Sequence, residues 1–114
     1  MRKVHLFVAC LAALSASACA DSDVDRTLGA RCDVVGECEQ RCLAPSRNTP
    51  GGMCSRSCTQ NTDCPGDSVC ADRDGGICLF PCSADGQCQF LGTGWYCDEL
   101  DGKDVPKVMA CYGE

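Results

Sequence analysis

Cysteine spacing is the feature that most constrains what this chain can fold into. Twelve cysteines follow residue 31, and they fall into three groups of four. In every group five residues separate the first two cysteines, and three residues separate the last cysteine from the next group. Only the later gaps vary, which is typical of a repeated module with variable internal loops. The groups are Cys32, Cys38, Cys42 and Cys54; Cys58, Cys64, Cys70 and Cys78; Cys82, Cys88, Cys97 and Cys111.

We expect these cysteines to form disulfides in a small, disulfide-rich, irregular fold with short β-hairpins, built as three tandem four-cysteine modules. The chain has 14 cysteines in 114 residues, and large apolar side chains are scarce beyond residue 18, so covalent bonds must replace much of a core. Four cysteines allow three pairings, which sequence alone cannot distinguish. We favour first-to-third and second-to-fourth pairing, because a first-to-second bond would close only a short loop. The module boundaries are 32–54, 55–78 and 79–114.

Residues between the cysteines repeat as well. A polar residue precedes the second cysteine of each module, namely Glu37, Asp63 or Gln87. The fourth cysteine follows a Gly-x pair in the first two modules, at Gly52 and Gly76, whereas the third module departs from this pattern.

Short hairpins are the main secondary structure that the sequence predicts. Residues 68–71 and 76–79 flank an Asp-Gly pair, which is typical of a tight hairpin turn. Residues 95–98 and 107–112 form a longer equivalent, with Asp101-Gly102 expected in its turn. In the first module we expect one helical turn, formed by Val34-Val35 and residues 37–43. Beyond residue 18 no stretch of ten residues has a convincing helical period.

The first 18 residues are predicted to be a signal peptide. Arg2 and Lys3 form a basic start, residues 6–14 are apolar, and residues 15–18 are the small residues of a cleavage region. The apolar stretch is too short to cross a bilayer as a helix.

Cys19 is predicted to carry a lipid. Residues 16–19 resemble the bacterial lipobox, whose cysteine is lipidated and becomes the mature N-terminus, although Ala16 stands where that pattern prefers leucine. Lipidation would remove an odd thiol from a chain whose other mature cysteines are even in number. Ala20 follows, rather than an aspartate that would retain a lipoprotein in the inner membrane, so the resemblance implies the outer membrane. The alternative is ordinary cleavage after Ala18 or Ala20. Residues 19–31 are expected to be the lipid attachment and an acidic tether.

Charge excludes some classes of partner. Without the signal peptide the chain has 8 basic and 16 acidic residues, a net charge of −8. Such a surface repels phosphates and anionic lipids, so we expect no nucleic-acid partner and no polybasic membrane contact. The membrane partner would be reached through the lipid alone.

The residue inventory gives no catalytic constellation, and we expect neither an enzyme, nor a cofactor, nor a metal site. The only histidine is His5, within the signal peptide, and no Cys-x-x-C spacing occurs. The acidic stretches 72–75 and 98–104 do not match a calcium loop and are interpreted as solvated turns. Metal storage by cysteine thiolates is the alternative to disulfides, and export argues against it.

Aromatic residues of the third module form a candidate binding surface, since exposed aromatic rings often mark recognition sites. These residues are Phe90, Trp95, Tyr96 and Tyr112. The competing interpretation, which we favour, is that Trp95 and Tyr96 fill a small core. A breaker-rich loop at residues 47–52 is a weaker candidate for an inhibitor-like binding loop.

The repeat C-x5-C-x(3–8)-C-x(7–13)-C-x3-C, with D-C-P-G-D-S-V-C at residues 63–70, resembles the cysteine-rich repeats of myxobacteria-type secreted proteins and lipoproteins. It is more distantly similar to disulfide modules of the EB and Dickkopf N-terminal type. The resemblance covers residues 32–111 and implies an extracytoplasmic, non-enzymatic protein. We therefore expect a lipid-anchored surface protein for recognition, adhesion or structural display, with an unidentified protein or glycan ligand. The alternative is a soluble secreted inhibitor or toxin-like effector.

Overall fold

The computed structural model describes residues 24–113. The predicted signal peptide and Cys19 lie outside this range. No helix within the described range is long and apolar enough to cross a membrane. The elements are the 3-10 helices η1 (Val35–Glu37), η2 (Asn61–Asp63) and η3 (Asp85–Leu91), and the strands β1 (Arg41–Leu43), β2 (Met53–Ser55), β3 (Val69–Ala71), β4 (Ile77–Leu79), β5 (Tyr96–Asp101) and β6 (Lys107–Tyr112).

Each module consists of one short 3-10 helix followed by one antiparallel hairpin. The hairpins β3–β4 and β5–β6 confirm the sequence prediction for the second and third modules. In the longer hairpin, Asp101 still belongs to β5 and pairs with Lys107, so the turn starts one residue later than expected. The hairpin β1–β2 of the first module was not predicted.

The helical turn expected in the first module is right only in part. Val35–Glu37 is helical, but Arg41–Leu43 is a strand. Arg41–Leu43 pairs antiparallel with Met53–Ser55, with Cys42 opposite Cys54, so this segment takes the extended form that strand pairing requires.

Six disulfides join the twelve cysteines between residues 32 and 111, and each module has the first-to-third and second-to-fourth pairing that we favoured. The Cα–Cα distances are 5.3–5.9 Å, ordinary for disulfides. The third and fourth cysteines of a module lie directly opposite one another in its hairpin. The hairpin thus holds the third and fourth cysteines side by side. The third is bonded to the first cysteine of the module and the fourth to the second. The bonds are Cys32–Cys42, Cys38–Cys54, Cys58–Cys70, Cys64–Cys78, Cys82–Cys97 and Cys88–Cys111.

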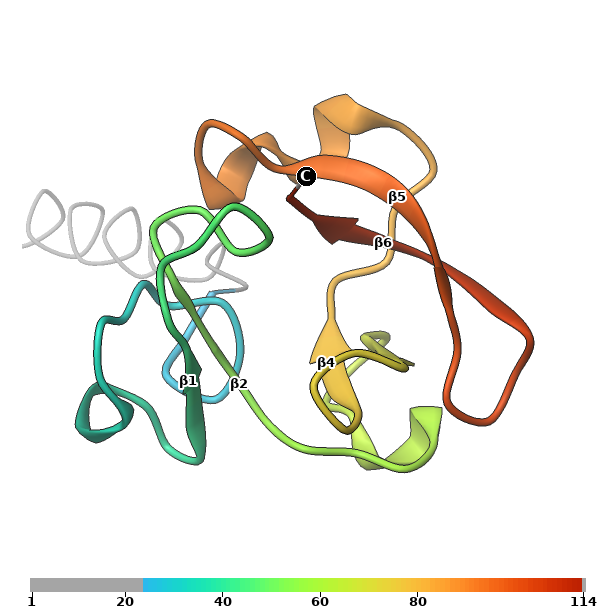
Figure 1. The fold of residues 1–114 in the computed structure, drawn as a ribbon, viewed down its shortest axis with the longest axis horizontal. Helices are drawn as coiled ribbons and strands as arrows, with labels where there is room; N and C mark the ends of the chain where they lie inside the picture. Colours follow the sequence, from blue (N-terminus) through green and yellow to red (C-terminus); the bar gives the residue numbers. More distant parts are fainter. Residues whose placement is uncertain (1–23, 114) are drawn as a thin grey trace, which may run out of the picture.

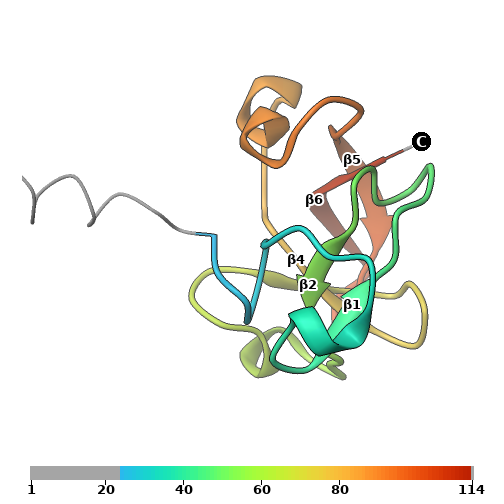
Figure 2. The same cartoon turned by 90° about the vertical axis from the view of Figure 1, so that its left-hand side faces the viewer.

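The three modules close on one another instead of forming a linear row. Figure 1 shows β1–β2 at the left, β4 at the lower centre and β5–β6 at the right, around a common middle. The view turned by 90° in Figure 2 also places β2 close to β4. In a linear array of repeats, the first module would contact only the second. Here it contacts the third as well.

One hydrogen bond at each junction illustrates this closure. Ser55 is the last residue of β2 and so belongs to the first hairpin, although it lies one residue past the predicted module boundary. Its buried hydroxyl donates to the Cys78 carbonyl oxygen of the second hairpin at 2.7 Å. Between the second and third modules, the Asp72 N–H donates to the Asp101 carbonyl oxygen at 2.8 Å.

The third junction joins residues far apart in the sequence. The Trp95 indole Nε1–H donates to the carbonyl oxygen of Pro50 at 3.0 Å, and the Gly113 N–H donates to that of Asn48. Loop 44–52 of the first module is thereby fixed against the third.

The three modules share one main core. Met53, Ile77 and Leu79 are completely buried, and Leu100 is nearly so, which brings apolar side chains of all three modules into a single cluster. Buried half-cystines complete this cluster, while a small separate group in the first module consists of Cys32, Cys38 and Cys54. Sulfur therefore fills space that aliphatic side chains would occupy in a larger domain.

The expectation of an acidic tether is wrong for residues 24–30, which are folded onto the first module. Leu28 is buried in the main core. The Gly29 N–H donates to the Cys54 carbonyl oxygen at 2.9 Å, and the Cys54 N–H donates to the Ala30 carbonyl oxygen at 2.7 Å.

The same contact occurs in the other two modules and explains the correction. In each module, the N–H of the fourth cysteine donates to the carbonyl oxygen of the residue two positions before the first cysteine. Cys78 donates to Arg56 at 3.1 Å, and Cys111 donates to Phe80 at 2.9 Å. Each module needs this leading segment to pair with its last strand, so the first module begins before Cys32.

Candidate functional site

The polar residue before each second cysteine has a structural role, which its position in the repeat did not reveal. Its side chain reaches back over the 3-10 helix and accepts two backbone N–H groups at the N-terminal end. Asp63 accepts from Thr59 at 2.9 Å and from Gln60 at 3.3 Å. These N–H groups lack partners within a short helix, and the side chain satisfies them.

Glu37 and Gln87 make the same pair of bonds in the other modules. The backbone donors are Asp33 and Val34 for Glu37, and Ser83 and Ala84 for Gln87. Hydrogen bonds from the backbone lower the pKa of Glu37 and that of Asp63, because they stabilise the charged carboxylate. Gln87 performs the same task without a charge. These residues therefore belong to the scaffold.

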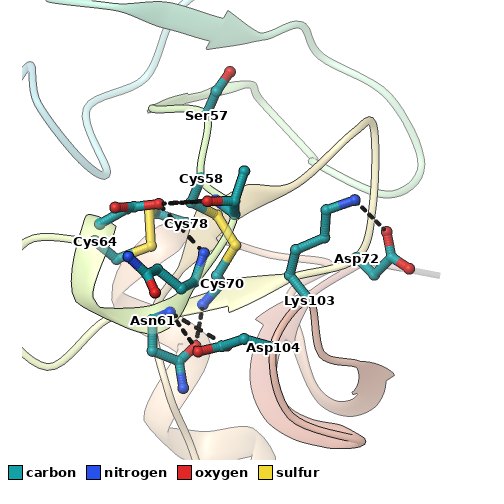
Figure 3. Close-up of a disulfide and its surroundings, with 12 residues drawn as sticks. Ser57, Cys58, Asn61, Cys64, Cys70, Asp72, Cys78, Lys103 and Asp104 are labelled. Atoms are coloured by element: carbon teal, nitrogen blue, oxygen red, sulfur yellow. Dashed lines mark hydrogen bonds and ion pairs between the residues drawn. A yellow bond between two sulfur atoms is a disulfide. The ribbon is translucent and has the colours of Figure 1, made fainter.

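Three carboxylates of the acidic stretches 72–75 and 98–104 are engaged with other groups, and Figure 3 shows two of them, Asp72 and Asp104. Asp72 forms an ion pair with Lys103 at 3.5 Å, and the Asp104 carboxylate accepts the Asn61 N–H at 3.3 Å. Asp101 bonds to Lys107 at 2.6 Å, which lowers the pKa of the Asp101 carboxyl and raises that of the Lys107 ammonium. These contacts are consistent with turns stabilised by charge pairs.

Sulfur atoms form the densest groups of potential metal ligands in residues 24–113. In each module three cysteine sulfurs lie within 4.8 Å of one another. All of these cysteines belong to disulfides, whereas a cysteine binds a metal ion as a free thiolate. The proximity follows from the hairpin register and from the two neighbouring bonds of each module. In the oxidised protein these groups are structural.

The four aromatic residues proposed as a binding surface do not form one patch. Trp95 and Tyr112 are buried. The Tyr112 ring lies 5.9 Å from the Arg73 guanidinium carbon, and burial raises the pKa of its hydroxyl. Phe90 and Tyr96 are exposed by 53% and 46%.

The interpretation that Trp95 and Tyr96 both fill the core therefore describes Trp95 but not Tyr96. The two residues are adjacent, and alternate side chains of an extended chain point to opposite faces. Trp95 enters the core just before β5 begins, and Tyr96, the first residue of β5, lies at the surface. Tyr96 and Phe90 line different clefts.

The largest of these clefts lies between modules and contains Phe90. Its volume is about 620 Å³. One wall is formed by Asp25, Thr27 and Leu28 of the N-terminal segment, and the second is the loop 65–68 of the second module. The third wall combines Phe80, Pro81 and Phe90 of the third module. Three parts of the chain that are distant in sequence thus build one concave surface.

Among the residues of this cleft, only Phe90 was predicted from the sequence to belong to a binding surface. Asp25 was assigned to a tether, and Asp67 was noted only as part of the motif at residues 63–70. No binding role was predicted for Asp67 or Phe80, because neither their spacing nor their chemistry distinguishes them from other surface residues. The cleft exists only because the first and third modules meet. A periodic pattern in the sequence does not report such a contact.

Loop 44–52, which contains the weaker inhibitor-like candidate at residues 47–52, is held in a bent form. The Ser46 hydroxyl oxygen accepts the N–H groups of Asn48 and Thr49 at 3.2 Å each, and the buried Thr49 hydroxyl donates to the Ala44 carbonyl oxygen at 2.8 Å. Arg47 remains exposed at its tip. The loop is thus a fixed junction with one outward arginine.

Comparison with protein families, curated proteins and solved structures finds no match to this chain. The resemblance to myxobacteria-type cysteine-rich repeats therefore stays a prediction. What the structure establishes is a disulfide-rich fold, and six disulfides indicate an extracytoplasmic protein, because such bonds persist in oxidising compartments.

Proposed function

We propose that this chain is an exported, non-catalytic surface protein, anchored by a lipid on Cys19, that displays its disulfide-bonded modules for recognition or adhesion. The observation that carries the proposal is the complete pairing of the twelve cysteines from Cys32 to Cys111. Pairing leaves Cys10, within the predicted signal peptide, and Cys19. A thiol at Cys19 would be the single odd cysteine of the mature chain, and lipidation would consume it.

The folded N-terminal segment bears on how such an anchor would present the protein. Residues 24–30 dock on the first module, so only residues 20–23 would separate a lipid on Cys19 from the domain. An extended chain spans at most about 3.3–3.6 Å per residue, so the domain would stand within roughly 20 Å of the membrane. This supports display close to the surface instead of at the end of a long stalk.

Intact mass of the mature protein, measured before and after reduction and alkylation, tests the proposal. We expect a species that starts at Cys19, carries lipid and gains twelve alkyl groups only after reduction. A Cys19→Ser variant should lose the lipid mass and its membrane association while keeping all six disulfides. A lipid-free wild-type protein that starts at Asp21 would contradict the anchor and favour a soluble effector. Alkylation without prior reduction would contradict the disulfide framework.

A soluble inhibitor is the second candidate, and one observation favours it. Arg47 projects from a loop that is fixed by its own hydrogen bonds and by the third module. Rigid loops with an exposed arginine suit proteases that cleave after basic residues. Titration of trypsin with the purified protein separates the alternatives, since an inhibitor would block hydrolysis of a small chromogenic substrate and lose this effect in Arg47→Ala. Simple cleavage after Arg47 would rule out the inhibitor.

A further inference from the structure

We propose that the cleft between the N-terminal segment and the second and third modules binds a basic segment of a partner protein. A lysine or arginine side chain would lay its methylene groups on the Phe90 ring, with its charged end near the carboxylates of Asp25 and Asp67. The proposal deepens the recognition role given above and rests on it, but it does not depend on the lipid anchor.

The size and construction of the cleft suit an extended peptide with one or two inserted side chains. Its volume of about 620 Å³ lies within the range of roughly 300–1,000 Å³ that is common for ligand sites. Disulfides hold two of its walls: loop 65–68 lies between Cys64 and Cys70, and Phe90 follows Cys88. A cleft fixed in this way loses little conformational entropy when a ligand binds.

Phe90 gives the cleft an exposed aromatic surface that is held in place. Its ring packs edge-to-face on Phe80, with 5.0 Å between ring centroids and an angle of 84°. Phe80 in turn lies against Gly29, where a Cβ would stand 2.9 Å from the ring. More than half of Phe90 nevertheless remains exposed. An exposed, immobilised ring attracts cations through its electron-rich face and aliphatic chains through its apolar area.

Charge decides what kind of segment fits. Asp25 and Asp67 are exposed, and none of the residues that line the cleft is basic. One oxygen of Asp25 accepts the N–H groups of Thr27 and Leu28, at 2.8 and 3.0 Å, which fixes the carboxylate in position. Over residues 24–113 the chain has 13 acidic and 8 basic residues, so its net charge is also negative. A basic protein segment is steered toward such a surface, whereas nucleic acid and anionic lipid are repelled.

Titration of the full exported protein, labelled with nitrogen-15, tests the site by NMR. The probe is a short acetylated peptide of alternating glycine and lysine, and the control peptide has glutamate in place of lysine. We expect saturable shifts at the backbone amides of Thr27, Gly66, Asp67 and Ser68, and no response to the control peptide. The indole N–H of Trp95, buried away from the cleft, should stay unchanged.

Three variants make the test specific. Asp67→Asn and Phe90→Leu should each weaken binding of the lysine peptide about 2- to 5-fold, the range expected for one exposed ion pair or cation–ring contact. Asp33→Asn is the matched control, because it removes the same charge from an exposed site on the first module that does not line the cleft. It should change the affinity by less than about 1.5-fold at physiological ionic strength, where distant charges are screened. An unchanged Trp95 indole signal verifies that each variant is folded.

Several results would overturn the proposal. Equal weakening by Asp33→Asn and Asp67→Asn would show attraction by net charge alone, and shifts outside the cleft would place the peptide elsewhere. If a lipid-bearing protein fails to bind the lysine peptide, the proposed role of the cleft is contradicted, but the proposal of surface display still stands. If the mature protein carries no lipid and binds the peptide saturably, the proposed role of the cleft is supported and the lipid anchor is contradicted.

Discussion

Gly76 lies directly against the main-chain carbonyl of Cys58, so closely that a Cβ on this glycine would overlap the carbonyl oxygen. Gly52 has the same relationship to Cys32 in the first module. Both glycines also have positive φ angles, +112° and +76°, which other residues rarely adopt. The Gly-x-Cys ending of the first two modules is therefore required by the approach of the last strand to the first cysteine.

Gly76→Ala should destabilise the oxidised protein by at least about 2 kcal/mol, since it combines a strained backbone with steric overlap. Guanidinium unfolding with disulfides intact, followed by the fluorescence of Trp95, measures the change. Gly86→Ala is the matched control, because nothing lies within 4 Å of its added Cβ and its φ is not positive. Its effect should stay within about 0.5 kcal/mol. Equal losses for both variants would contradict this account of Gly76.

The cap formed by Asp63 predicts that the local stability of the fold depends on pH only in the modules whose cap is a carboxylate. Because hydrogen bonds lower the folded-state pKa of Asp63 below its ordinary value of 3.8, this carboxylate stabilises the fold above that pH. The contribution is lost as the pH falls through the lower, folded-state pKa. The amide proton shifts of Thr59 and Gln60 should therefore titrate together at a pH below 3.8.

Gln87 provides an internal control for this titration. It caps the third module without an ionisable group, so the amide shifts of Ser83 and Ala84 should show no corresponding step. In Asp63→Asn the step should disappear at Thr59 and persist at Asp33, whose N–H is bonded to Glu37. A step at Ser83 of similar size would indicate general acid unfolding instead of cap protonation.

Trp95→Phe tests the junction between the first and third modules. The indole donates to the Pro50 carbonyl oxygen, and loss of this donor leaves the oxygen without that bond, at a cost of about 1–3 kcal/mol. Hydrogen exchange of the Gly113 N–H, bonded to Asn48 across the same junction, should become faster. Exchange at Cys78, which bonds to Arg56 in the second module, should change little. Uniform acceleration at both sites would mean that the junction does not open separately.

Cys82–Cys97 should be the first disulfide to be reduced. Both of its cysteines are half-buried, whereas every other bond includes at least one buried cysteine. Attack on a disulfide requires access to sulfur, so limited phosphine reduction and rapid alkylation should label Cys82 and Cys97 first. Cys58–Cys70 is the matched comparison, because it is the first-to-third bond of its own module and both cysteines are buried. Earlier labelling of Cys58 would show that access does not control the order.

By itself, the sequence determined the division into three four-cysteine modules. Fixed spacing around Cys58, Cys64, Cys70 and Cys78 predicted a module, and its turn residues predicted a hairpin, because spacing and turn chemistry are local signals. The pairing was only favoured among three possibilities, and the structure confirms it. The repeat also marked the positions of Asp63 and Gly76, although their roles as cap and as contact with Cys58 required coordinates.

Tertiary structure decided how the modules meet, and hence the candidate site. Residues 24–30 looked like part of a polar tether because the segment is polar and has no periodicity. In the structure its leucine, Leu28, is buried, and its backbone pairs with the last strand of the first module. The closure of the first module on the third depends on single contacts, such as Trp95 with Pro50, between residues 45 apart. No periodicity encodes such contacts, and the cleft that joins Asp25, Asp67 and Phe90 exists only as their consequence.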